Sequence, residues 1–294
     1  MASAIPVLPD QRIAELSAPY REALAAKRRT TLVGLLVLAV LTMAAARVAE
    51  VDPGKFLANI SRFTDYFGRL FYLDTGKLVF TDVAEWFWGF GKWARHIVDT
   101  LLIAYLGTLL GAIFGFFLCF AATVNMAVSP AQRFVARRFL EFCRTVPELV
   151  FALIFVVAFG LGPVPGVLAI MIHTLGALGK LFAEVVENID MKPVEGAIAA
   201  GATRWQAIRY AVVPQVLPNF ASYALLRFEI NVRGASVMGF VGAGGIGAEL
   251  IEAIRKFYYS DVSAILVLII ATVMVIDVVT ERIRHGLISP EHAR

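Results

Sequence analysis

The stretch DMKPVEGAIAAGATRWQAIRYAVVPQVLP, residues 190–218, lies between strongly hydrophobic segments and yet carries the signals of two short helices. Pro193 suits a first helical turn, because its missing N–H would have no intrahelical partner there. Glu195 falls in the same turn, where the helix dipole favours a carboxylate. Gly201 suits a helix end that requires a positive φ. The pattern predicts a rigid helical elbow whose small residues let another protein come close.

A second helix is expected directly after this glycine. Thr203 and Gln206 form a capping-box pattern, in which each side chain accepts a hydrogen bond from the other residue's backbone N–H. Pro214 and Pro218 follow, so the next hydrophobic segment is expected to enter at a bend.

The composition excludes a soluble domain. Of the 294 residues, 59% are hydrophobic and 17% are charged, and the mean hydropathy is +0.74. Such values are typical of a polytopic membrane protein. The net charge of +4 is therefore taken as a sign of which loops face the cytoplasm, and not of a nucleic-acid-binding surface. Cys119 lies in an apolar segment and Cys143 in an expected cytoplasmic flank, which predicts neither a disulfide nor a metal site.

Six apolar segments are expected to cross the membrane, with both termini in the cytoplasm. The basic side chains of residues 133–144 and the basic residues after position 281 mark the cytoplasmic side. The expected spans are residues 30–46, 97–124, 145–161, 167–186, 214–240 and 262–279. The expected organisation is a cytoplasmic tail (1–29), a first transmembrane helix (30–50), an external amphipathic segment (51–95), a five-helix core (96–285) with a coupling loop (190–214), and a cytoplasmic tail (286–294).

Aromatic and glycine patterns refine this topology. The tryptophan-rich stretch 86–93 is expected to form an aromatic belt at the membrane interface. Gly107, Gly111 and Gly115 recur every four residues, which predicts close packing of the second span against another helix.

The fifth span is unusual because it carries Arg227, Glu229, Asn231 and Arg233. Charges inside a membrane are costly unless they pair or face water. Glu229 and Arg233 are four residues apart, so they are expected to share one helix face and pair, whereas the other two lie on other faces. Two interpretations stay open: a structural ion pair that locks the span, or a polar lining of a translocation path.

Three further features were candidates for function. Glu148, after Pro147, is either an interfacial carboxylate or a gate at the cytoplasmic end. His173 is expected to be an interior histidine with hydrogen-bond partners and not a proton relay. The run GAGGIG, residues 242–247, lacks the strand and acidic residue of a dinucleotide site and predicts a tight bend. The sequence also has no phosphate-binding P-loop, so ATP would have to bind to a separate subunit.

The elbow resembles the EAA loop of binding-protein-dependent ABC importer permeases, whose pattern is Glu-Ala-Ala, three residues, Gly, nine residues and Ile-x-Leu-Pro. The corresponding residues here are Glu195, Gly196, Ala197, Gly201, Ala211, Val213 and Pro214. Gly196 replaces an alanine, and Ala211 and Val213 replace isoleucine and leucine, which keeps the spacing. Residues 227–247 are similar to the phosphonate-importer branch of this family, and the resemblance covers about residues 97–283.

This resemblance implies an all-α, six-helix membrane protein with the type I ABC importer permease fold, in a bacterial cytoplasmic membrane. It implies a second copy of the chain, two cytoplasmic ATPase subunits and an external substrate-binding protein as partners. ATP and Mg would bind to the ATPase, with no cofactor in this chain. The implied cargo is a phosphonate or a related phosphorus oxyanion. The implied ATPase-coupling residues are Glu195, Gly196, Ala197, Gly201 and Arg204, and the implied gate glycines are Gly242, Gly244 and Gly245.

Two alternatives to a phosphonate permease stay open. The first is a permease for another small solute, such as methionine or a quaternary amine. The second is an intramembrane hydrolase that uses Glu148, His173 and Glu229. The absence of a His-Glu-x-x-His or Gly-x-Ser-x-Gly motif argues against the hydrolase.

Overall fold

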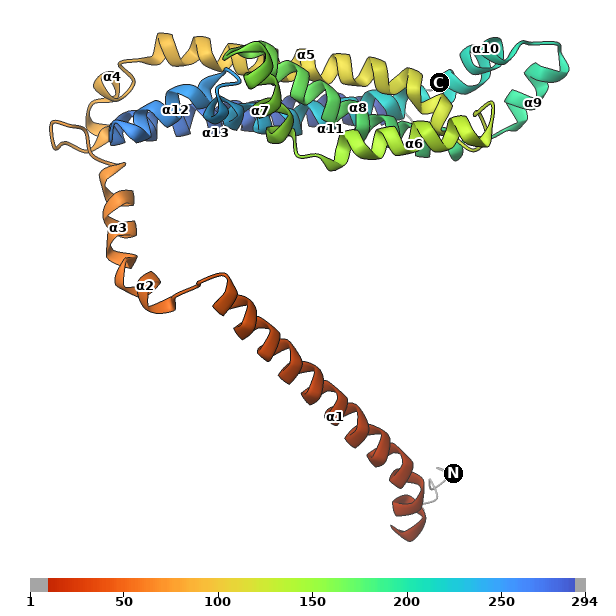
Figure 1. Cartoon of the computed structure of the whole chain (residues 1–294), viewed down its shortest axis with the longest axis horizontal. Helices are drawn as coiled ribbons and strands as arrows, with labels where there is room; N and C mark the ends of the chain where they lie inside the picture. The colour runs from red at the N-terminus through yellow and green to blue at the C-terminus, as the bar shows by residue number, and fades with distance from the viewer. Residues whose placement is uncertain (1–9, 289–294) are drawn as a thin grey trace, which may run out of the picture. The chain divides into compact units, whose positions relative to one another are not determined.

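The computed structural model describes residues 10–288, in which the regular structure is helical apart from one isolated bridge between Tyr72 and Leu78 (Figure 1). Residues 1–9 and 289–294, which belong to the two expected cytoplasmic tails, lie outside the described range. The chain divides into two compact units, residues 1–66 and 67–294.

The first unit is dominated by one long helix, α1 (Asp10–Val48). This helix crosses the expected boundary between tail and span at residue 29 without a break, because the strong helix formers of residues 20–29 continue it. The part from Pro19 to Val48 is long and apolar enough to cross a membrane. The expected tail 1–29 is therefore largely helical, and the helix ends at Val48 instead of residue 50.

Two short helices follow in the expected amphipathic segment: α2 (Pro53–Ala58) and α3 (Ile60–Arg69). Asp52 begins α2 by accepting hydrogen bonds from the N–H groups of Gly54 and Lys55. Neither helix has a buried residue. The segment is thus helical as expected, with its apolar side chains exposed within this unit.

The second unit is a helical bundle in which α5 (Phe90–Ala122) and α8 (Pro163–Glu187) pack along each other. The predicted glycine positions lie on this contact: a side chain at Gly107 would collide with Ile170, and one at Gly111 with Thr174. The remaining elements are η1 (Val79–Thr81), α4 (Val83–Trp86), α6 (Pro130–Thr145), α7 (Glu148–Phe159), α9 (Lys192–Ala199), α10 (Arg204–Ala207), η2 (Ile208–Val212), α11 (Val213–Met238), η3 (Gly239–Val241), α12 (Ile246–Arg255) and α13 (Tyr259–Ile288).

Length and apolarity indicate up to six membrane crossings in the described residues. Four helices qualify alone, and two bent pairs, α6 with α7 and α11 with α12, qualify as one crossing each. The helix α7 lies within the expected third span, residues 145–161. The chain bends by 85° between α6 and α7, and α7 has 12 residues. A helix of that length reaches about 18 Å, short of a hydrocarbon core of about 30 Å, so α7 by itself does not cross the membrane.

The aromatic stretch 86–93 belongs partly to the protein core. Trp86 and Trp93 are buried, and the Trp86 indole N–H donates to Ser263 at 2.9 Å. Trp88 is exposed and donates to Asp261 at 2.9 Å. The stretch 86–93 therefore does more than form the expected interfacial belt. Its tryptophan side chains also connect the chain just before α5 to α13.

Candidate functional site

The elbow formed by α9 and α10 projects from one end of the bundle, as Figure 1 shows. Pro193 lies in the first turn of α9, and Glu195 is exposed in the same turn. Gly201 has φ of 87°, a conformation that glycine adopts without strain. The backbone N–H of Thr203 donates to Gln206 Oε1 at 2.7 Å and completes a capping box. These local predictions are confirmed.

The connection from the elbow into α11 differs from expectation. Residues from Arg204 to Val241 form one continuous helical run, so Pro214 and Pro218 do not interrupt the helix. The π-helical turn η2 directly precedes α11, and Pro214 stands in the first turn of α11. A π turn widens the helix and re-routes the hydrogen bonds that proline cannot make. The elbow is thus rigidly continuous with a membrane helix.

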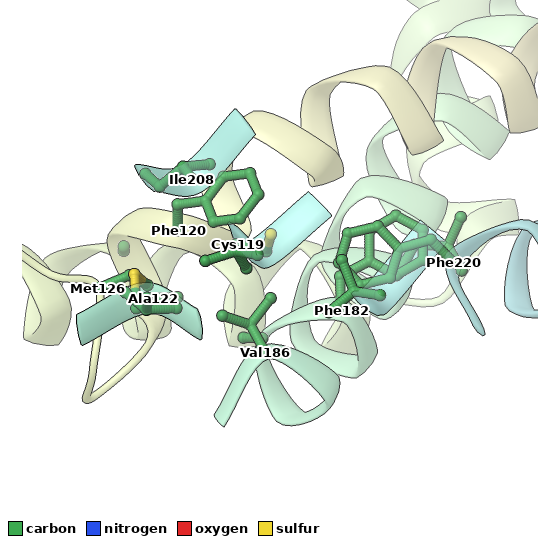
Figure 2. Packing of buried hydrophobic residues seen from close by; sticks show 14 of the residues in the cluster. Cys119, Phe120, Ala122, Met126, Phe182, Val186, Ile208 and Phe220 are labelled. Atoms are coloured by element: carbon green, nitrogen blue, oxygen red, sulfur yellow. The ribbon is translucent and has the colours of Figure 1, made fainter. Parts of the chain in front are cut away.

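A hydrophobic cluster anchors the elbow to the ends of α5 and α8 (Figure 2). Val194 from α9 and Ile208 from η2 are buried together with Phe120 of α5 and Val186 of α8. Deeper in the same cluster, Phe182 and Phe220 stack with ring centroids 4.0 Å apart. A movement of the elbow is therefore transmitted directly to the packed ends of three membrane helices.

The outward face of the elbow carries large apolar side chains without cover in this chain. Ile198, Trp205 and Tyr210 are 57%, 68% and 69% exposed. Gly196 is exposed and Ala197 is half-buried in the same helix. Arg204, which the family resemblance placed among the coupling residues, donates to the carbonyl oxygen of Met126 within the chain. This face has the apolar and small-residue character of a protein-docking surface.

A first polar cluster joins Glu148 of α7, His173 of α8 and Arg227 of α11. Arg227 Nη2 lies 2.7 Å from His173 Nδ1, and Glu148 Oε2 lies 3.5 Å from the same nitrogen. Arginine has no acceptor atom, so His173 must accept at Nδ1 and carry its proton on Nε2. That nitrogen lies 3.1 Å from the Arg144 carbonyl oxygen, at the end of α6. His173 is a satisfied interior histidine, as expected, and it connects the helix break to Arg227.

A second polar cluster joins α11 to α13. Arg233 Nη2 donates to Glu229 Oε1 at 2.6 Å and to the two carboxylate oxygens of Asp277 at 2.8 and 2.9 Å. Thr280 Oγ1 lies 3.4 Å from Glu229 Oε2. The predicted pairing of Glu229 with Arg233 is confirmed. Sequence reasoning missed Asp277. The signal was available, because a lone carboxylate inside the last apolar segment indicates a cationic partner on another helix.

Asn231 connects α11 to the two central helices of the bundle. It is fully buried, and its Nδ2 donates to Thr108 of α5 and Thr174 of α8, each at 2.8 Å. These hydrogen bonds pin α11 to the central helix pair. Of the two interpretations left open for the fifth span, these contacts of Asn231 support the structural one.

The glycine run is a tight bend against the outer turns of the bundle, as predicted. Gly242, Gly244 and Gly245 have φ of 81°, 83° and 82°. The Gly162 N–H donates to the Gly242 carbonyl oxygen at 2.9 Å, and the Ile246 N–H donates to Thr100 Oγ1 at 2.8 Å. The bend thus joins the start of α8, the start of α12 and the outer part of α5.

The arrangement does not form a hydrolytic site. Glu148 and His173 are together, but Glu229 belongs to the second cluster with Arg233 and Asp277. In residues 10–288, no group of three or more His, Cys, Asp or Glu side chains is placed to hold a metal ion. What the geometry provides is a set of cationic and anionic side chains that pair with one another between packed helices.

Comparisons with known proteins agree with this architecture. Residues 107–288 match the family described as "Binding-protein-dependent transport system inner membrane component". The chain is 47% identical over 191 residues to the phosphite transport system permease protein PtxC of Stutzerimonas stutzeri, which covers 65% of this chain and 70% of that protein. It is 32% identical over 277 residues to the putative phosphite transport system permease protein HtxC of the same organism, covering 94% of both chains. It is 41% identical to the phosphate-import permease protein PhnE of Mycolicibacterium smegmatis, covering 67% of this chain and 37% of that one.

Solved structures show the same fold. The MetNI methionine ABC transporter has a chain similar to this one with a TM-score of 0.57 at 20% identity, covering 67% of this chain and 96% of that chain. A bacterial ABC transporter for the acidic polysaccharide alginate gives a TM-score of 0.54 at 16% identity, covering 95% and 99%. The chain therefore belongs to the binding-protein-dependent transport system inner membrane component family and has the all-α fold of an ABC importer permease.

Proposed function

We propose that this chain is the permease subunit that forms the translocation path of an ATP-driven importer for phosphonates or related phosphorus oxyanions. The observation that carries the transport role is the elbow, which is exposed on its outer face and continuous with α11 on its inner side. A docking element built in this way converts a partner's movement into a helix movement. The cargo class is supported by the relatives, whose names are those of phosphite and phosphate permeases.

The proposed assembly contains two copies of this chain, two cytoplasmic ATPase subunits and an external substrate-binding protein, in a bacterial cytoplasmic membrane. The ATPase would bind ATP and Mg, and this chain would need no cofactor. The elbow face with Glu195, Gly196, Ala197 and Gly201 would contact the ATPase. Arg204 would act indirectly, by fixing the elbow to the Met126 carbonyl group.

The path would use the two polar clusters of α11. Arg227 and Arg233 would supply positive charge for an anionic cargo. His173 contacts Arg227, and Glu229 pairs with Arg233. The glycine bend of residues 242–247 would form part of the outer gate, because it contacts the start of α8 and Thr100 of α5 and leads into α12.

Uptake into sealed vesicles tests this function. The importer is reconstituted with its ATPase and binding protein, and accumulation of radiolabelled phosphite is measured with and without enclosed ATP. We expect ATP-dependent accumulation that unlabelled methylphosphonate or phosphate reduces and that methionine and choline leave unchanged. Accumulation that methionine or choline suppresses, or none with any phosphorus oxyanion, would refute the proposed cargo.

The topology is testable with single cysteines. Thr75, Ala131 and Gly286 are exposed, and a Cβ at Gly286 meets no neighbouring atom. We expect an impermeant thiol reagent applied to whole cells to label Thr75→Cys and to spare Ala131→Cys and Gly286→Cys, because basic flanks face the cytoplasm. The two natural cysteines are buried, so the chain without an added cysteine serves as the unlabelled control. Labelling at residue 131 would overturn the assigned sidedness.

A further inference from the structure

The loop between α5 and α6, residues 123–129, is bonded to the elbow. Arg204, the first residue of α10, donates from its guanidinium to the carbonyl oxygen of Met126 in this loop. Met126 is buried in the hydrophobic cluster that anchors the elbow (Figure 2). Its N–H donates to the Thr123 hydroxyl oxygen at 3.2 Å, which braces the loop internally. A displacement of the elbow therefore acts on this loop as well as on α11.

The same loop is tied to the end of α8. Glu187 is the last residue of α8, and its Oε1 accepts from the Val124 N–H at 2.7 Å. The Asn125 side chain donates to the Val186 carbonyl oxygen at 2.8 Å. A carboxylate at a helix C-terminus meets the negative end of the helix dipole, so Glu187 needs a cation beside it to offset that cost.

Arg137 of α6 is this cation, and it brings a third helix into the contact. Its Nη2 donates to Glu187 Oε1 at 2.5 Å, and its Nε donates at 2.8 Å to the carbonyl oxygen of Ala122, the last residue of α5. Carbonyl groups at a helix end lack intrahelical partners, and a positive charge is favourable there. One guanidinium thus caps α5 and neutralises the carboxylate at the end of α8.

The helix α6 continues the connection toward the membrane. It packs against α8 and leads through the 85° bend into α7. The helix α7 also packs against α8, and its Glu148 lies 3.5 Å from His173. The elbow therefore has two connections to the bundle: directly through η2 into α11, and through residues 123–129 into α6 and α7.

We propose that Arg137 and Glu187 are positioning residues for transport, which hold residues 123–129 where Met126 receives Arg204, so that the elbow moves α6 and α7 together with α11. The inference rests on the proposed function, in which the ATPase moves the elbow. Without the Arg137–Glu187 contact, the loop stays bonded to the elbow but is released from α6. The movement then reaches α11 alone, and ATP is hydrolysed in cycles that carry no cargo.

The proposal predicts a lower amount of phosphite taken up per ATP hydrolysed. Both quantities are measured in the same sealed vesicles with the complete importer. Arg137→Gln should lower this ratio by about fivefold, because it removes the contact with Glu187 and the cap on Ala122. Glu187→Leu should lower the ratio to a similar extent, because Val124 and Arg137 both lose their acceptor. Glu187→Gln should keep most of the ratio, because its amide oxygen can still accept from the Val124 N–H.

Controls separate positioning from stability. Arg138→Gln is the matched control, because this adjacent arginine pairs with Glu141 of its own helix, and it should leave the ratio unchanged. Thermal unfolding of the detergent-extracted complex measures stability separately. Loss of assembled complex lowers uptake and hydrolysis alike, so a role in stability alone would leave their ratio unchanged. If Arg137→Gln fails to assemble, the comparison of Glu187→Leu with Glu187→Gln decides.

An unchanged ratio in Arg137→Gln and Glu187→Leu would overturn the inference. Equal losses in Glu187→Leu and Glu187→Gln, or a loss in Arg138→Gln as large as that in Arg137→Gln, would also overturn it. In each of these cases, normal phosphite uptake by the unmodified importer leaves the proposed function standing. Absence of uptake by the unmodified importer would instead reject that function, and this inference with it.

Discussion

Gly201→Val is expected to abolish ATP-driven uptake while leaving the permease able to assemble in the membrane. Residue 201 has φ of 87°, and a β-branched side chain in this region costs about 1–3 kcal/mol. A Cβ at this position would meet no other atom within 4 Å, so the whole penalty falls on the backbone angle. The elbow would relieve it by changing the angle between α9 and α10, which changes the docking face.

The measurement compares uptake with ATP hydrolysis in the same vesicles. Gly201→Asn is the tolerant variant, because asparagine adopts positive φ more readily than other non-glycine residues. Gly286→Ala is the matched control: this glycine lies in the helix α13, outside the elbow, and its Cβ would be in open space. We expect both to keep most of the uptake. Full substrate-stimulated ATPase activity and uptake by Gly201→Val would show that the elbow geometry is not what couples the subunits.

The elbow was predictable from sequence because its determinants are local. A proline in the first turn, a glycine at the helix end and a Thr-x-x-Gln capping box each act within a few residues. The i,i+4 spacing of Glu229 and Arg233 is also local, and their pairing is confirmed at 2.6 Å. Such features can be recognised without knowing which helices are neighbours.

The composition of the polar clusters was not predictable, because it depends on contacts between distant helices. Asp277 is 44 residues from Arg233, and His173 is 54 residues from Arg227. The 85° angle between α6 and α7 was also not predictable, because hydrophobicity indicates where a span begins but not its direction relative to the helix before it. Pairing across helices is fixed by packing, and one sequence carries little information about it.

The newly identified Asp277 changes what is expected from substitutions in the second cluster. Arg233 holds two carboxylates, Glu229 and Asp277, so Arg233→Gln leaves two like charges facing each other between α11 and α13. Breaking a buried ion pair costs about 3–5 kcal/mol. The side chains of Arg233 and Asp277 are 46% and 38% exposed, so solvent screening lowers this cost. We therefore expect Arg233→Gln to reduce the free energy of unfolding by about 2 kcal/mol.

Glu229→Gln should destabilise the protein less than Arg233→Gln, by below about 1 kcal/mol, because Arg233 keeps Asp277 as a partner. The double variant Arg233→Gln/Asp277→Asn leaves one carboxylate without a like-charged neighbour, so it should recover most of the stability lost in Arg233→Gln. Thermal unfolding and yield of the detergent-extracted complex measure these differences. Equal losses in Glu229→Gln and Arg233→Gln, with no recovery in the double variant, would show that the three side chains do not act as one cluster.

Uptake by the double variant then separates the two roles that the sequence left open. If the cluster only locks α11 to α13, a variant that folds normally should also transport normally, since the neutral side chains still fill the contact. If Arg233 also faces the cargo, uptake should stay low at normal yield, because the anion meets one cation fewer along its path. We expect the second result, since Arg233 is half-exposed whereas Glu229 is only 13% exposed, which leaves the guanidinium accessible while its carboxylate partner is covered.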